Sequence, residues 1–64
     1  MEEYRIAFLE NNLVTEIRKF FAHCPGCALK ACDTDLMFQA LKKQKAILIH
    51  PNGESENIDL SLFI

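Results

Sequence analysis

The stretch IAFLENNLVTEIRKFFAHC, residues 6–24, decides the fold because its hydrophobic period changes partway along. Residues 4–9 are a short apolar run rich in strand-forming types, and residues 10–12 are typical turn and cap residues that end it. Beyond this point apolar residues recur at helical spacing, at Leu13, Ile17, Phe20 or Phe21, and Cys24. The pattern predicts a strand followed by an amphipathic helix of about three turns, which Pro25-Gly26 ends.

The downstream sequence repeats this alternation. Residues 28–32 are a weaker strand candidate, and the acidic cluster at 33–35 is expected to cap a second helix. Residues 46–49 are a continuous apolar run, typical of a strand buried on both faces of a parallel sheet. This order predicts an α/β fold, β-α-β-α-β, with a small three-stranded parallel sheet. Residues 1–64 are expected to form a single unit, and residues 58–64 to open a third helix inside which the chain stops.

Composition narrows the function classes. Half of the 64 residues are hydrophobic, which is enough for a globular core. The formal net charge of −2 argues against a nucleic-acid-binding module, because neutralising phosphates needs a clustered Lys/Arg excess. No apolar run approaches the roughly 20 residues of a membrane span, and the acidic N-terminus does not resemble a signal peptide. Three cysteines are an odd number for a secreted disulfide scaffold, so reduced thiols and a cytoplasmic location are expected.

Three segments cover nearly the whole chain: IAFLENNLVTEIRKFF, CPGCALKACDTDLMFQALKKQKAILI and NGESENIDLSLFI. In this order they resemble the N-terminal half of a response-regulator receiver domain, a flavodoxin-like fold. The resemblance implies that Glu10 and Asn11 occupy the family's Mg²⁺-binding acidic pair and that Pro51 occupies its phosphoacceptor position. Glu10 is the only carboxylate that remains of this pair, and the proline side chain has no nucleophilic atom. The resemblance therefore implies a degenerate, receiver-like half domain that does not accept phosphate on aspartate.

The function implied by this resemblance is a non-catalytic regulatory or protein-interaction module in signal transduction or transcription regulation. Such a module would be a pseudo-receiver without enzymatic activity or cofactor. A three-stranded sheet would leave the strand at 46–49 as an open edge, and this edge predicts a homodimer or another protein partner.

The cluster His23, Cys24, Cys27 and Cys32 leaves two alternatives open. Three thiolates and an imidazole could hold Zn²⁺ and make the chain a small zinc-stabilised adaptor, although all four side chains lie within ten residues. The motif Cys24-Pro-Gly-Cys27 also resembles that of thioredoxin- and glutaredoxin-like proteins, where FFAHC would end a strand and CPGC would open a helix. The predicted helix at residues 13–21 argues against this second alternative. The simplest interpretation is that the cysteines are small buried hydrophobic residues.

Overall fold

The chain begins with a long β-hairpin. The computed structural model describes residues 1–64, and in it β1 (Glu2–Glu10) pairs antiparallel with β2 (Leu13–Ala22). Asn11 and Asn12 connect the strands with φ angles of 53° and 66°. Asparagine tolerates this left-handed region better than most residues, and two such residues in a row form the turn that matches the twist of a hairpin.

The predicted helix at residues 13–21 is therefore wrong. The segment is strand β2, and it contains the strand-forming residues Val14, Thr15, Ile17, Phe20 and Phe21. Local turn chemistry explains the outcome, because the Asn11-Asn12 turn reverses the chain and places this segment directly beside β1. Backbone hydrogen bonding to β1 along this segment, interrupted only by a bulge at Thr15, then outweighs its helical spacing of apolar residues.

Two short helices follow the hairpin. They are α1 (Pro25–Ala31) and α2 (Asp33–Leu41), with Cys32 between them. The predicted strand at 28–32 is wrong, since these residues belong to α1 and its C-terminal cap. The predicted second helix is confirmed, and Asp33 and Asp35 lie in its first turn, where carboxylates complement the helix dipole.

The sheet is four-stranded and antiparallel, in the order β2-β1-β3-β4. β3 (Lys45–Ile49) pairs antiparallel with β1, and β4 (Ser55–Asn57) pairs antiparallel with β3. The predicted three-stranded parallel sheet, and with it the flavodoxin-like or receiver-like half domain, is wrong. β2 and β3 do run in the same direction, but β1 lies between them. The hairpin at Asn11-Asn12 thus gives β2 the opposite direction to β1, and β3 pairs with β1 antiparallel as well.

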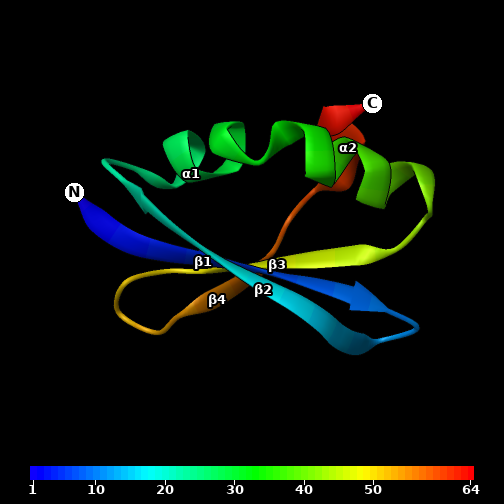
Figure 1. Cartoon of the computed structure of the whole chain (residues 1–64), viewed down its shortest axis with the longest axis horizontal. Coiled ribbons are helices and arrows are strands. Elements are labelled where there is room, and N and C mark those ends of the chain that lie inside the picture. The colour runs from blue at the N-terminus through cyan, green and yellow to red at the C-terminus, as the bar shows by residue number, and fades with distance from the viewer.

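The helices cover only one face of this sheet, and the opposite face is open (Figure 1). The core lies between the helices and the covered face and consists of Tyr4, Ile6, Phe8, Ala22, Ala28, Cys32, Leu36, Ala46 and Leu48. Ala7 and Leu9 alternate with the core residues of β1 and are buried outside this core. They therefore lie on the open face, where neighbouring side chains of the sheet cover them.

A buried glutamine fixes the sheet against α2. The side-chain amide of Gln39 donates hydrogen bonds to the carbonyl oxygens of Leu9 (2.7 Å) and Lys45 (2.8 Å). These carbonyls belong to paired residues at the end of β1 and the start of β3. Gln39 therefore holds both strands at the same point along α2, and a residue without this amide would leave buried carbonyls unpaired.

The C-terminal segment forms a single 3₁₀ turn, η1 (Leu60–Phe63), where a third helix was predicted to open. Asp59 caps it by accepting a hydrogen bond from the Ser61 amide at 3.1 Å. Leu60 and Phe63 pack against the edge of the core. No helix of the protein is long and apolar enough to cross a membrane.

Candidate thiol site at the start of α1

The CPGC motif lies where β2 ends and α1 begins. Ala22, the last residue of β2, is buried, and the chain then emerges so that Cys24 and Cys27 are exposed. Cys24 is the N-cap of α1, with the extended backbone typical of that position (φ −153°, ψ 163°). Pro25 follows within the first turn, where its missing N–H and fixed φ favour the start of a helix.

The two thiols of the motif are in direct contact. The Sγ atoms of Cys24 and Cys27 are 2.8 Å apart, and both cysteines are free. The backbone N–H of Cys27 also donates a hydrogen bond to Cys24 Sγ at 3.2 Å. Because a disulfide bond is about 2.05 Å long, a small side-chain movement would join the two sulfur atoms.

This contact makes the two thiols unequal. The hydrogen bond with the Cys27 side chain, and then that from the Cys27 N–H, lower the pKa of Cys24 although desolvation opposes them. The same side-chain hydrogen bond with Cys24 is the main cause that raises the pKa of Cys27, with desolvation adding to it. The geometry therefore favours a thiolate on Cys24 and a protonated thiol on Cys27.

An aromatic residue of β1 lies near this pair. Burial is the main cause that raises the pKa of Tyr4, and the charges of Glu2, Cys24 and Cys27 contribute in the same direction. The Tyr4 ring meets the His50 ring edge-on, with centroids 5.9 Å apart. The motif thus borders the covered face of the sheet near the start of β1.

Cys32 is separated from the pair by α1 and lies in a different environment. It is 2% exposed, belongs to the core and has Asp35 Oδ2 3.8 Å from its Sγ. Desolvation and the nearby Asp35 charge raise the pKa of its thiol to about 11. This burial agrees with the interpretation of the cysteines as small hydrophobic residues, whereas Cys24 and Cys27 do not fit it because they are exposed.

The four predicted zinc ligands are not assembled into one cluster. Cys24 and Cys27 are together, Cys32 is in the core, and His23 is exposed. The protein contains no group of three or more His, Cys, Asp or Glu side chains placed to hold a metal ion.

The residues that the receiver resemblance brings together lie far apart. Glu10 ends β1 at the hairpin, and Asn11 forms the turn, where its N–H donates a hydrogen bond to the Gln44 side chain at 3.0 Å. Pro51 follows β3. Since β1 and β3 are antiparallel, the end of β1 lies beside the start of β3, and Pro51 is at the other end of the sheet. The predicted acidic pocket therefore has no counterpart in this fold.

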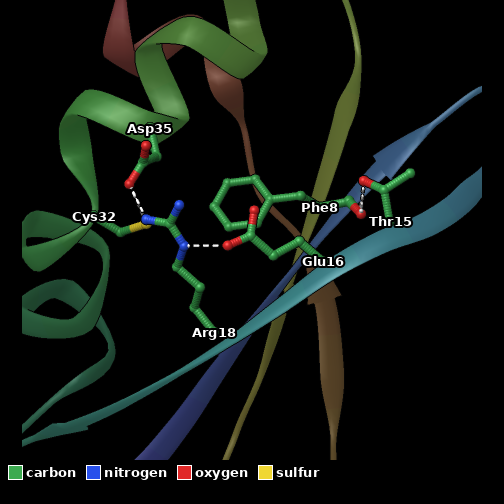
Figure 2. A network of polar contacts seen from close by, with 6 residues as sticks. All are labelled: Phe8, Thr15, Glu16, Arg18, Cys32 and Asp35. Atoms are coloured by element: carbon green, nitrogen blue, oxygen red, sulfur yellow. Dashed lines mark hydrogen bonds and ion pairs between the residues drawn. The ribbon is translucent and has the colours of Figure 1, made fainter.

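A polar network between β2 and α2 was not predicted from the sequence. Arg18 lies over the Phe8 ring, 5.6 Å from its centroid, and its Nε donates to Glu16 Oε2 at 2.6 Å (Figure 2). Its guanidinium also forms an ion pair with Asp35 of α2. The hydrogen bond to Glu16 is the largest cause that raises the pKa of Arg18. Residues two apart share a face of a strand, so this network could be found in the sequence only once residues 13–22 were recognised as extended.

Comparisons of the chain with protein-family models, curated proteins and solved structures give no significant match. The features of the molecule that bear on its function are the geometry of the thiol pair and the surfaces that the fold leaves uncovered.

Proposed function

We propose that this protein is a thiol–disulfide redox protein in which Cys24 is the attacking thiol and Cys27 the resolving thiol. The observation that carries the proposal is the contact between their Sγ atoms at 2.8 Å, with Cys24 at the N-cap of α1. Hydrogen bonds from the Cys27 side chain and backbone lower the pKa of the exposed thiol that would attack. A thiolate that is both exposed and stabilised is the reactive form of cysteine.

The exchange would proceed in two steps. In the first, the Cys24 thiolate attacks one sulfur of a substrate disulfide, forms a mixed disulfide with it and releases the other substrate sulfur as a thiolate. In the second, Cys27 loses its proton to solvent and attacks Cys24 Sγ, which releases the second substrate thiolate and forms the Cys24–Cys27 disulfide. Two electrons pass from the protein to the substrate, and the reverse sequence oxidises a substrate dithiol.

The helix predicted at residues 13–21 is one of two reasons against this function, the other being that the chain lacks the later elements of a thioredoxin-like fold, including its proline-bearing loop. The segment 13–21 belongs to strand β2, so the motif follows a strand and opens a helix, which is the arrangement that the thioredoxin-like interpretation requires. The resemblance concerns the motif and its local setting only. The antiparallel order β2-β1-β3-β4 supplies a different framework for it.

A redox titration with mass-spectrometric mapping tests the proposal. We expect one reversible two-electron transition that joins Cys24 to Cys27 and leaves Cys32 as a free thiol. Cys32→Ser is the matched control, since it removes a cysteine but leaves the pair intact. Failure of the Cys24–Cys27 disulfide to form in glutathione buffers would reject the function. Repeating the titration with a chelator tests the zinc alternative, because zinc bound to Cys24 and Cys27 would block their oxidation until it is removed.

A non-catalytic interaction module is the second candidate function, and it does not depend on a receiver fold. The observation that favours it is the open face of the sheet, where Ile17 is 55% and Phe21 is 65% exposed (Figure 1). Exposed apolar side chains gathered on one surface are typical of a binding surface. A double Cys24→Ser, Cys27→Ser variant that keeps its protein partners would support this function over thiol exchange.

A further inference from the structure

β2 is a long edge strand with nothing paired to its outer side. The sheet order leaves β2 and β4 as edges, and β4 has three residues whereas β2 has ten. Short edges are protected by their length, but a long edge offers a row of unpaired backbone donors and acceptors to another strand. The edge that the structure leaves open is therefore β2, and the predicted edge at residues 46–49 is an interior strand, β3.

The side chains of β2 carry charges in an order that is complementary to itself. Ile17 pairs with Ala7 and lies on the open face, with Glu16 and Arg18 directly before and after it on the helix-covered face. Their side chains remain 50% and 39% exposed, so both can accept a further partner. An antiparallel copy of the strand centred on Ile17 would place each Glu16 opposite an Arg18.

We propose that a second copy of this chain pairs its β2 antiparallel with β2 about a two-fold axis at Ile17. The two sheets then join into one continuous sheet, with both helical layers on the same side, because a two-fold axis perpendicular to the sheet preserves its faces. Ile17 meets Ile17 of the second copy, and two Glu16–Arg18 pairs flank the axis.

Charge selects this register among its neighbours. Registers centred on Glu16, Arg18 or Lys19 would each place identical charges opposite one another, which destabilises a cross-strand pair. Centring on Phe20 or Phe21 avoids this but overlaps only the last part of the strand. The Ile17 register combines opposite charges at the axis with overlap along most of β2, interrupted only where Lys19 meets the bulge at Thr15. This favours a second copy over an unrelated strand.

Pairing of the two β2 strands would also place the thiol site of each chain next to the other chain. In this register Ala22 lies opposite Asn12 of the second copy, and Cys24 follows two residues later. Each CPGC motif would therefore border the hairpin turn of the other chain. This consequence concerns access to the thiols, and the dimer itself does not depend on the proposed redox function.

Charge substitutions at Ile17 test the register directly, because residue 17 lies opposite residue 17 of the second copy only in this register. We expect the reduced wild-type protein to show a monomer–dimer equilibrium in sedimentation experiments across the micromolar range. Ile17→Lys and Ile17→Glu should each weaken the dimer, since like charges would meet at the axis. An equimolar mixture of the two variants should associate about tenfold more tightly than either variant alone. Residue 17 makes no ion pair in the monomer, so both variants are expected to fold.

Lys19→Glu is the matched control, since Lys19 also lies on β2 but would meet the second copy at the bulge of the uncharged Thr15. It should change the dimer dissociation constant by less than the Ile17 variants do. A wild-type protein that stays monomeric overturns the proposal. So does a dimer that the Ile17 variants leave unchanged, or a mixture that associates no better than its components.

Discussion

A cysteine lies at each end of α1, and the two thiols are in opposite environments. At its start Cys24 is exposed and hydrogen-bonded, and its pKa is lowered. At its end Cys32 is buried beside Asp35, and its pKa is raised to about 11. The difference shows that position on the helix decides the protonation of each thiol, because hydrogen-bond donors gather at the N-cap whereas Cys32 packs into the core at the other end.

Removing one cysteine at a time should have the largest effect, and it tests whether Cys24 and Cys32 differ in disulfide exchange. Cys24→Ser should abolish disulfide exchange, since no attacking thiol remains, whereas Cys32→Ser should retain it. Serine is a favourable N-cap, so the first variant is expected to keep α1 folded. Turnover of a dithiol–disulfide substrate measures the effect, and circular dichroism checks the fold. Equal activity of the two variants would show that the exposed pair has no special role.

The second largest expected difference is between the alkylation rates of Cys24 and Cys32. A thiol with a pKa of about 11 is ionised in roughly one molecule in ten thousand at neutral pH, against a few per cent for an ordinary thiol. We expect iodoacetamide to modify Cys24 at least about a hundredfold faster than Cys32 in the folded protein. The pH profile of Cys24 should have its midpoint below the ordinary pKa of a cysteine thiol, because hydrogen bonds from Cys27 lower the pKa of Cys24.

The control for this experiment is the same measurement in denaturant. Unfolding removes both the hydrogen bonds of Cys24 and the burial of Cys32, so the two rates should become similar. A large difference that persists after unfolding would assign the effect to local sequence instead of the fold.

The raised pKa of Cys32 also predicts how stability depends on pH. In the unfolded chain this thiol ionises near its usual 9.0, whereas in the folded protein it ionises near 11. The folded state therefore holds the proton more tightly, and the stabilisation is fully present below pH 9 and is lost as the pH rises towards 11. Denaturant unfolding at several pH values should show a fall in the free energy of unfolding over this range.

Cys32→Ala is the matched variant for the pH experiment. It should cost about 1 kcal/mol at neutral pH because it leaves a small gap in the core. It should also remove the part of the alkaline loss that comes from the Cys32 thiol. An identical alkaline slope in both proteins would mean that other groups cause it.

The comparison between residues 13–22 and residues 33–41 shows how much of the fold the sequence could predict. The second of these segments begins with a strong cap cluster and forms the predicted helix α2. The first has apolar residues at helical spacing but is a strand, because the Asn11-Asn12 turn pairs it with β1. Two turn residues between apolar segments are also a hairpin signal, and in this chain that signal outweighs the helical period.

This single misassignment accounts for most of the other errors. It made the strand at residues 46–49 parallel to the first strand, and so it supported the receiver resemblance, in which Glu10 and Asn11 occupy the acidic pair and Pro51 the phosphoacceptor position. It also argued against a redox role for Cys24 and Cys27, since a CPGC motif that ends a helix does not lie at a helix N-terminus. The motif itself was visible in the sequence, but the contact between Cys24 and Cys27 and the burial of Cys32 depend on where α1 starts.

The smallest predicted effect concerns Gly26, which lies between the paired thiols in the first turn of α1. A Cβ atom at this position would be 3.9 Å from Cys24 Sγ, which is an ordinary contact, and the backbone has no positive φ that would strain alanine. Gly26→Ala should therefore stabilise the protein by about 0.4–1 kcal/mol, chiefly by restricting the unfolded chain. The added methyl group should slow attack by Cys24 by less than about tenfold, which would correspond to a barrier increase of about 1.4 kcal/mol.

Gly53 provides the matched control for this substitution. It has open space around the position of a Cβ, but its φ of +90° lies in the region that alanine rarely adopts. Gly53→Ala should therefore destabilise the protein, while exchange by the thiol pair stays unchanged because the added methyl group would have no atom within 4 Å. Thermal unfolding of both variants distinguishes backbone strain from contact with the thiol. If Gly26→Ala destabilised the protein as much as Gly53→Ala, the first turn of α1 would need a glycine, and the N-cap geometry that lowers the pKa of Cys24 would have to be revised.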